Sequence, residues 1–132
     1  MPIWANISRP NAGPGDKDLL YEIAAYQLAT AISGVEVANS VQTATGRNET
    51  HCSPLEVKFV TEVTHSAEML ARSEADPLVK KLISLYQDDL QELKIGKRFD
   101  EVYDVDTLEP TKEWLATYQS VYEEISDLGV PL

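Results

Sequence analysis

The spacing of hydrophobic positions predicts four helices, at about residues 17–32, 53–72, 76–93 and 110–128. Each stretch has apolar residues at i, i+3 and i+4, which is the pattern of a helix with one buried face. Their predicted starts carry capping residues or prolines, namely Asp16, Ser53-Pro54-Leu55-Glu56, Asp76-Pro77 and Pro110. Glycines follow the first, third and fourth stretches, at Gly34, Gly96 and Gly129. The chain is therefore expected to be mainly α-helical.

Two short segments have the composition of strands. Val35–Thr43 places valines among Ser and Thr residues, and Ile3–Ile7 is the remaining candidate, within a lead rich in proline and glycine. A lone strand leaves N–H and C=O groups unpaired on both edges, so each segment needs partners. The order strand, helix, strand, helix is half of a parallel βαβα unit. This order is typical of the end of a larger α/β protein.

Composition and charge narrow the expected partners. The chain has 132 residues, enough for one domain, and a formal net charge of −11 that lies mainly in residues 67–132. We expect no binding to nucleic acid or anionic membranes, because both need clustered Lys and Arg. No apolar run approaches the roughly 20 residues of a membrane span, and the first residues lack a signal-peptide pattern. With Cys52 as its single cysteine, the chain is expected in the cytoplasm.

Three motifs contain residue types that occur in catalytic or metal sites, and none of them predicts such a site. Glu62-x-x-His65 has the spacing of di-iron bundles, but such sites need a second copy of the motif. His51-Cys52 does not predict a nucleophile–base pair, since adjacent side chains rarely point at one another. The acidic loop 104–109 lacks the glycine and the final glutamate of a calcium loop. We expect exposed pairs and solvated loops at these positions.

The polar loop Thr43–His51 is a better candidate for function. It follows a candidate strand and precedes a helix, which in a (β/α)8 barrel would place it on the face where active sites form. Arg47, Asn48 and His51 are its polar groups of interest. Parallel strands should bring this loop to the same side as Asn6–Arg9. An ordinary solvated loop remains the alternative.

Three C-terminal stretches closely resemble the end of the pyrrolysine-containing monomethylamine:corrinoid methyltransferases. They are KKLISLYQDDL, GKRFDEVYDVDTLEPTKEW and ISDLGV. Near the start, Asn6, Pro10 and Ala12-Gly13-Pro14 are similar to the family's segment just after a late barrel strand. The resemblance covers nearly the whole chain, but only the last part of the family protein.

The resemblance implies a fold class: mainly α with one or two short strands, formed by the last βα units of a (β/α)8 barrel and a helical C-terminal extension. Residues 1–75 would be the barrel part and residues 76–132 the extension. In the family, a pyrrolysine imine captures methylamine, and the methyl group passes to the Co(I) of a corrinoid on a partner protein. The pyrrolysine and two neighbouring glutamates belong to the part absent here. The family's active-site glutamine, directly after the position of Asn6, is Ile7 in this chain.

The expected function is therefore the C-terminal portion of a methylamine:corrinoid methyltransferase-like protein, inactive alone and without a directly bound cofactor. The loops expected to face substrate or partner contain Asn6, Ile7, Arg9, Arg47, Asn48 and His51. Expected partners are a corrinoid protein, the remaining barrel chain or a second copy, because open strand edges favour association. The alternative is a non-enzymatic, acidic helical module that binds a partner.

Overall fold

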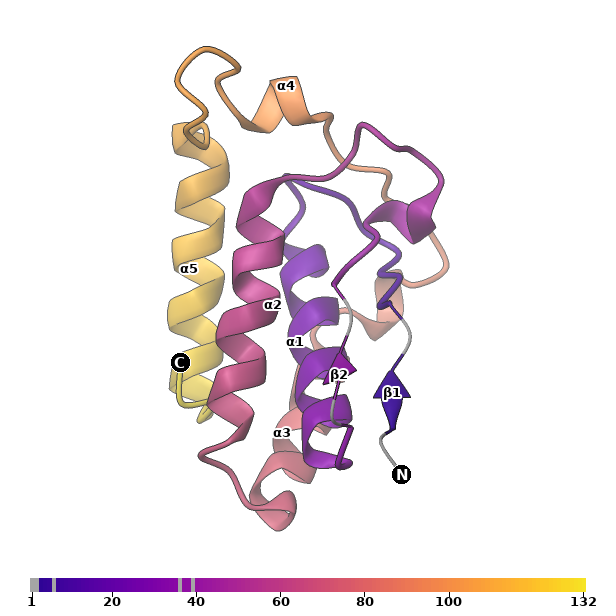
Figure 1. Cartoon of the computed structure of the whole chain (residues 1–132), viewed down its shortest axis with the longest axis vertical. Helices are drawn as coiled ribbons and strands as arrows, with labels where there is room; N and C mark the ends of the chain where they lie inside the picture. Colours follow the sequence, from indigo (N-terminus) through magenta and orange to yellow (C-terminus); the bar gives the residue numbers. More distant parts are fainter. Residues whose placement is uncertain (1–2, 6, 36, 39) are drawn as a thin grey trace.

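The structure is a computed structural model that describes residues 3–5, 7–35, 37–38 and 40–132. Four long helices pack side by side, and a pair of short strands lies along one flank (Figure 1). The helices are α1 (Lys17–Ile32), α2 (Pro54–Ala67), α3 (Arg72–Ser84) and α5 (Lys112–Leu128). The strands are β1 (Trp4–Ala5) and β2 (Val37–Ala38). The short helical segments are the 3-10 helices η1 (Ala44–Gly46) and η2 (Gln87–Asp89) and the one-turn helix α4 (Phe99–Val102). The mainly helical prediction is confirmed.

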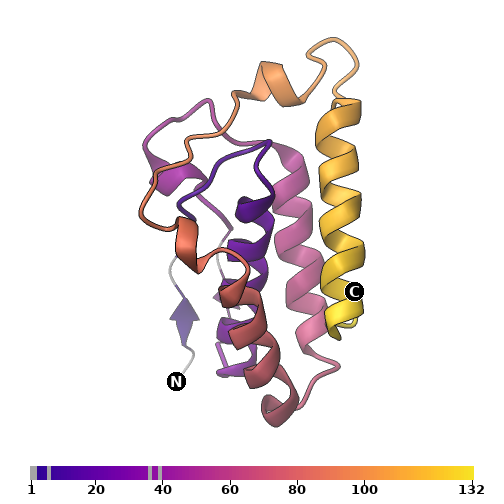
Figure 2. The same ribbon diagram turned by 180° about the vertical axis from the view of Figure 1, so that it is seen from behind.

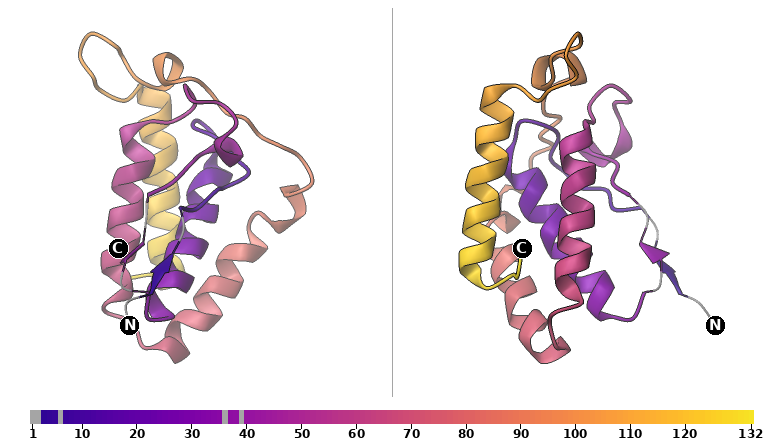
Figure 3. Two further views of the ribbon diagram at one scale, coloured as in Figure 1. Left: turned by 45° about the vertical axis from the view of Figure 1, so that its right-hand side comes forward. Right: turned by 60° about the vertical axis from the view of Figure 1, so that its left-hand side comes forward.

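The two strands are parallel and are joined through α1. Trp4 pairs with Val37, and the pairing continues to a bridge between Ser8 and Val41. The backbone N–H of Gln42 donates to the Ser8 carbonyl at 2.8 Å. The predicted strand–helix–strand order is confirmed, but each assigned strand has two residues, far fewer than the expected 35–43 segment. Within the described ranges, the helices cover one side of the pair and no segment crosses the other side (Figure 3).

Helix α1 is the centre of the molecule, because it contacts α2, α3 and α5 as well as β2. It lies between the strand pair and α3, as the view from behind shows (Figure 2). Its start and end agree with the prediction: the Asp16 side chain accepts from the Asp18 backbone N–H at 2.9 Å, and Gly34 follows with φ +80°. The apolar side chains that it buries completely are Leu19, Leu20, Ile23, Ala24 and Leu28.

One hydrophobic core includes residues of α1, α2, α3 and α5. In it, the rings of Phe59 and Tyr118 meet edge to face with centroids 5.7 Å apart. The predicted boundary between residues 75 and 76 falls inside α3, which packs on α1. The division into a barrel part and an extension therefore stays a prediction about the longer protein. Every helix in the described part of the chain is too short or too polar to cross a bilayer.

The predicted bounds of the middle helices are wrong. The helix after Ser53 ends at Ala67 instead of Arg72, and α3 spans 72–84 instead of 76–93. The Glu74 carboxylate accepts from the Ala71 backbone N–H at 2.8 Å, so this cap starts α3 one turn before the Asp-Pro signal. Pro77 is tolerated inside the helix, near its beginning. After Ser84 the chain leaves the helical path, and Lys94 reaches Asp18 on α1 at 2.5 Å.

Gly96 was expected to end a helix, and its role is different. A Cβ atom on Gly13 would lie 2.2 Å from the Ile95 carbonyl oxygen, and one on Gly96 would lie 2.4 Å from the carbonyl carbon of Gly13. Both positions must be glycine because two backbone segments touch there, and the Lys97 N–H donates to the Pro14 carbonyl at 2.7 Å. The last helix also differs: Thr111 caps it, so Pro110 precedes the first turn.

Candidate functional site

The end of the parallel strand pair has a buried face and an open face. Ser8 and Val41 are buried, and Val41 belongs to the core. Because successive side chains alternate along extended chain, the neighbours Ile7, Arg9 and Gln42 belong to the opposite face. Arg9 and Gln42 are exposed, and Arg9 Nε donates to Gln42 Oε1 at 3.1 Å, which places both on one face. The open face thus carries a fixed pair of polar side chains where both strands end.

The chain after β2 makes an unusual turn. Ala44, Thr45 and Gly46 all have left-handed backbone angles, with φ of 48°, 58° and 73°. Non-glycine residues avoid this region, so the surrounding structure must hold the turn. The N–H groups of Ala44 and Thr45 donate to the carbonyls of Ala12 and Pro10 at 2.9 and 2.8 Å. These bonds tie the loop after β2 to the segment after β1.

The turn also leaves room for the Gln42 side chain. A Cβ atom at Gly46 would lie 3.0 Å from Gln42 Oε1, so the glycine lets the amide lie against the backbone. Gln42 and Asn48 line a shallow hollow of about 280 Å3, together with Glu49 and Cys52. Burial, and then the charge of Glu56, raise the pKa of the Cys52 thiol, which therefore makes a weak nucleophile. The hollow thus offers two side-chain amides for hydrogen bonding, from Gln42 and Asn48, beside the Glu49 carboxylate.

The predicted loop residues are only partly brought together. The loop does lie on the same side as Arg9, as predicted, while Asn6 lies outside the described residues. Asn48 joins Gln42, but Arg47 and His51 are absent from the lining of that hollow. His51 closes the loop instead: its carbonyl accepts from the Thr43 hydroxyl, and its N–H donates to the Asn48 carbonyl at 3.1 Å. The substrate-facing roles of all these residues stay predictions.

Gln42 is the site residue that the sequence analysis missed. The composition of residues 35–43 predicts a strand and does not show which face each side chain takes. Side chains alternate between the two faces of a strand, so the burial of Val41 places Gln42 on the open face. The sequence does not show which residues of the strand are buried.

The acidic motifs have structural contacts of their own. Glu62 accepts from the Tyr118 hydroxyl and pairs with Lys58 at 3.4 Å, while His65 pairs with Glu68 at 3.7 Å. Asp104 accepts from two backbone N–H groups of its own turn, which lowers the pKa of that carboxyl. Among the residues that the structure describes, no three His, Cys, Asp or Glu side chains are grouped to hold a metal ion.

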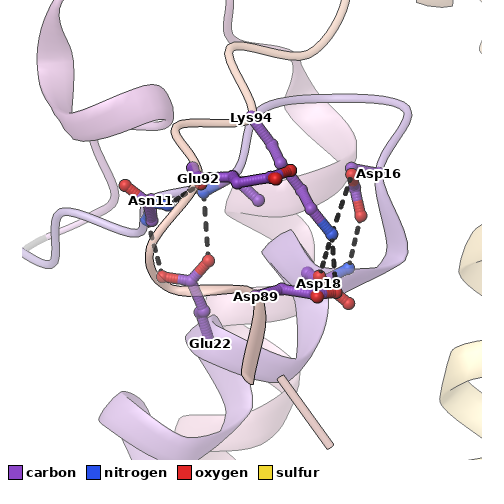
Figure 4. A network of polar contacts seen from close by, with 8 residues as sticks. Asn11, Asp16, Asp18, Glu22, Asp89, Glu92 and Lys94 are labelled. Atoms are coloured by element: carbon purple, nitrogen blue, oxygen red, sulfur yellow. Dashed lines mark hydrogen bonds and ion pairs between the residues drawn. The ribbon is translucent and has the colours of Figure 1, made fainter. Parts of the chain in front are cut away.

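A polar network fixes the segment that follows β1 (Figure 4). Lys94 Nζ lies 2.5 Å from Asp18 and 2.9 Å from Asp89, and these two acceptors raise the pKa of the Lys94 ammonium. Beside it, the Glu22 carboxylate accepts from the backbone N–H of Asn11 at 2.6 Å and from that of Ala12 at 3.0 Å. The network holds the 10–16 segment against α1 and thereby positions the end of β1.

The mainly helical chain contains a parallel strand–helix–strand unit, and its candidate site lies at the carboxyl edge of the two strands. Comparison with known proteins identifies the family. The sequence profile of monomethylamine methyltransferase MtmB matches residues 3–130, so the chain belongs to the MtmB family. This confirms the resemblance seen in the sequence.

Individual relatives give the same result. Monomethylamine methyltransferase MtmB1 of Methanosarcina barkeri is 31% identical over 121 residues, which are 92% of this chain and 26% of that protein. MtmB1 of Methanosarcina acetivorans matches with the same identity and coverage. The crystal structure of M. barkeri MtmB superposes with a TM-score of 0.87 at 30% identity, over 94% of this chain and 28% of that one. The chain thus spans about a quarter of the length of its curated relatives.

Proposed function

We propose that this chain is the C-terminal portion of a monomethylamine methyltransferase-like enzyme and completes its (β/α)8 barrel. In this proposal β1 and β2 are the last two barrel strands, and the helices after residue 75 form the extension. The complete enzyme moves a methyl group from monomethylamine to the Co(I) of a corrinoid that a partner protein carries. The isolated chain has no such activity.

The observation that carries the proposal is the parallel strand pair with helices on one side only. A barrel strand is buried on both faces, by the barrel filling and by the surrounding helices. Ile3 and Trp4, at the start of β1, are 57% and 70% exposed, which is unusual for large apolar side chains. The preceding part of a barrel, with its strands and their helices, would cover both faces at the start of β1 and pair with the open edges.

The same proposal gives the open-face residues a role. At the mouth of a barrel, the carboxyl ends of the strands carry the residues that act on substrate. Arg9 uses Nε on Gln42, which leaves its Nη groups and the Gln42 Nε2 group as hydrogen-bond donors. These donors would hydrogen-bond to acceptor oxygens, either of the pyrrolysine that captures the substrate in the family or of the docked partner protein. Ile7 belongs to the same face but has no polar atom to contribute.

Complementation tests the proposal. M. barkeri MtmB lacking the segment that this chain matches would be co-expressed with the chain, and association measured by co-purification. Methylation of a reduced corrinoid protein with monomethylamine, followed by absorbance, measures activity. We expect a complex, and no activity from either part alone. Activity of the isolated chain would contradict the proposal. A folded chain that does not co-purify with the truncated relative would also contradict it, and would favour the partner-binding module.

Ile7 offers a sharper version of the same test. In the complex, Ile7→Gln should raise the methylation rate, because an amide can hydrogen-bond where the aliphatic side chain cannot. Ile3→Gln is the matched control, since alternation puts residue 3 on the same face but at the other end of β1. Equal rates for the two variants would show that position 7 does not face the reacting groups.

A further inference from the structure

The hollow at the end of the strands has a cation at its rim and a carboxylate in its wall. Among the residues that line this space of about 280 Å3, Glu49 is the one acid, and the lining contains no Lys or Arg. Arg9 lies at the rim, because its Nε atom is 3.1 Å from Gln42 Oε1, an oxygen that lies against Gly46 of the lining. Opposite charges thus meet the same small space.

Neither charge is neutralised by the described residues. Arg9 and Glu49 are both exposed, and neither forms an ion pair with that part of the chain. Arg9 uses the Nε donor of its guanidinium on Gln42, and its Nη groups keep their N–H donors. Acidic residues outnumber basic ones 22 to 11, so an arginine with no carboxylate beside it is available to an anion from outside the chain.

The left-handed turn after β2 gives the hollow a fixed shape. Strained backbone that the surrounding structure holds in place is typical of binding sites. Here the turn places Gly46 against Gln42, and the Gln42 amide in turn holds the Arg9 guanidinium. The Gln42 Nε2 group and the Asn48 side-chain amide make no hydrogen bond with the described residues, so both can bind a ligand.

We propose that this hollow binds a small zwitterionic amino acid. The carboxylate of the ligand accepts from the Arg9 guanidinium and Gln42 Nε2, and its ammonium group pairs with the Glu49 carboxylate. Pockets for drug-sized molecules are about 300–1,000 Å3, so this smaller hollow suits a ligand of a few heavy atoms, with Val41 as an apolar contact. Binding here requires no methyl transfer, so the site stands or falls separately from the proposed function.

NMR titration of the isotope-labelled 132-residue chain tests the site. Glycine is the probe, and sodium acetate and methylammonium chloride, at constant ionic strength, each supply one of its two charged groups. Glycine should shift the side-chain amide signals of Gln42 and Asn48 and the backbone signal of Gly46 saturably. Each half-ligand should bind about tenfold more weakly, because it makes one of the two charged contacts. Unchanged signals with glycine, or a half-ligand that binds as tightly as glycine, would overturn the proposal.

Variants that remove one charge each locate the ligand. Arg9→Gln should weaken the binding of glycine and acetate about tenfold and leave that of methylammonium unchanged. Glu49→Gln should weaken glycine and methylammonium and leave acetate unchanged, a split that a general loss of structure would not produce. Arg72→Gln and Glu68→Gln remove exposed charges elsewhere, and as matched controls they should bind glycine as the unaltered chain does. Full glycine binding by Arg9→Gln or Glu49→Gln would refute the site.

Discussion

Glu56→Gln should remove a pH dependence that is built into the core. Glu56 is completely buried in the first turn of α2, where its carboxylate accepts from both the backbone N–H and the hydroxyl of Ser53. The Ser53 hydroxyl oxygen also accepts from Trp114 Nε1 of α5 at 3.2 Å. Burial raises the pKa of Glu56 to about 7, although the hydrogen bonds from Ser53 oppose this increase.

The sign of the effect follows from proton binding. In the unfolded chain the Glu56 carboxyl has its ordinary pKa of 4.5, so between pH 4.5 and 7 the folded state holds a proton that the unfolded state has lost. The contribution to stability is complete below pH 4.5 and is lost as the pH rises to about 7. The difference between the two pKa values corresponds to about 3 kcal/mol, of which about 2.5 kcal/mol falls between pH 5 and pH 8.

The assay is urea unfolding of the chain and of Glu56→Gln at pH 5 and pH 8. Glutamine has nearly the shape of a protonated glutamate but does not titrate. The free energy of unfolding of the variant, relative to that of the unaltered chain, should therefore be about 2.5 kcal/mol higher at pH 8 than at pH 5. Other titrating carboxyls are common to both proteins and cancel. Glu74→Gln alters the exposed cap of α3, and its difference in free energy of unfolding from the unaltered chain should be the same at both pH values. A pH-independent gap for Glu56→Gln would refute the reasoning.

The other predictions concern packing and ion pairing, measured by urea unfolding. Gly13→Ala should lower the free energy of unfolding by more than about 2 kcal/mol, because its Cβ would meet fixed backbone at 2.2 Å. Gly34→Ala has open space around its Cβ and should lower it by about 1 kcal/mol, because of its φ of +80°. Equal losses of stability would argue against the backbone contact. Lys94→Met should cost about 2 kcal/mol, because it leaves the Asp18 carboxylate, 4% exposed, without its cation. Lys80→Met breaks an exposed pair and should cost less than about 0.5 kcal/mol, and a similar loss from both lysines would contradict the network.

The sequence by itself determined the features that depend on neighbouring residues. The bounds of α1 and the start of α2 were predicted because their caps are local. Asp16 accepts from the N–H of Asp18, and Glu56 accepts from the N–H of Ser53. The end of α5 at Gly129 was predicted for the same kind of reason. The strand–helix–strand order and the family were also predicted from the sequence, because strand-forming residues, helix-breaking glycines and prolines, and family motifs are patterns of neighbouring residues.

Only the tertiary structure decided the features that join distant segments. Gly13 and Gly96 are glycines because two backbones meet there, and Arg9 finds Gln42 across 33 positions of chain. The left-handed turn at Ala44–Gly46 is held by carbonyls of the segment after β1, and no local preference of alanine or threonine favours it. Helical periodicity continues past Ser84, but the contact of Lys94 with α1 takes the chain elsewhere. Local patterns specify hydrogen bonds within a turn of chain, whereas a site assembled from separate strands depends on which backbones the core brings together.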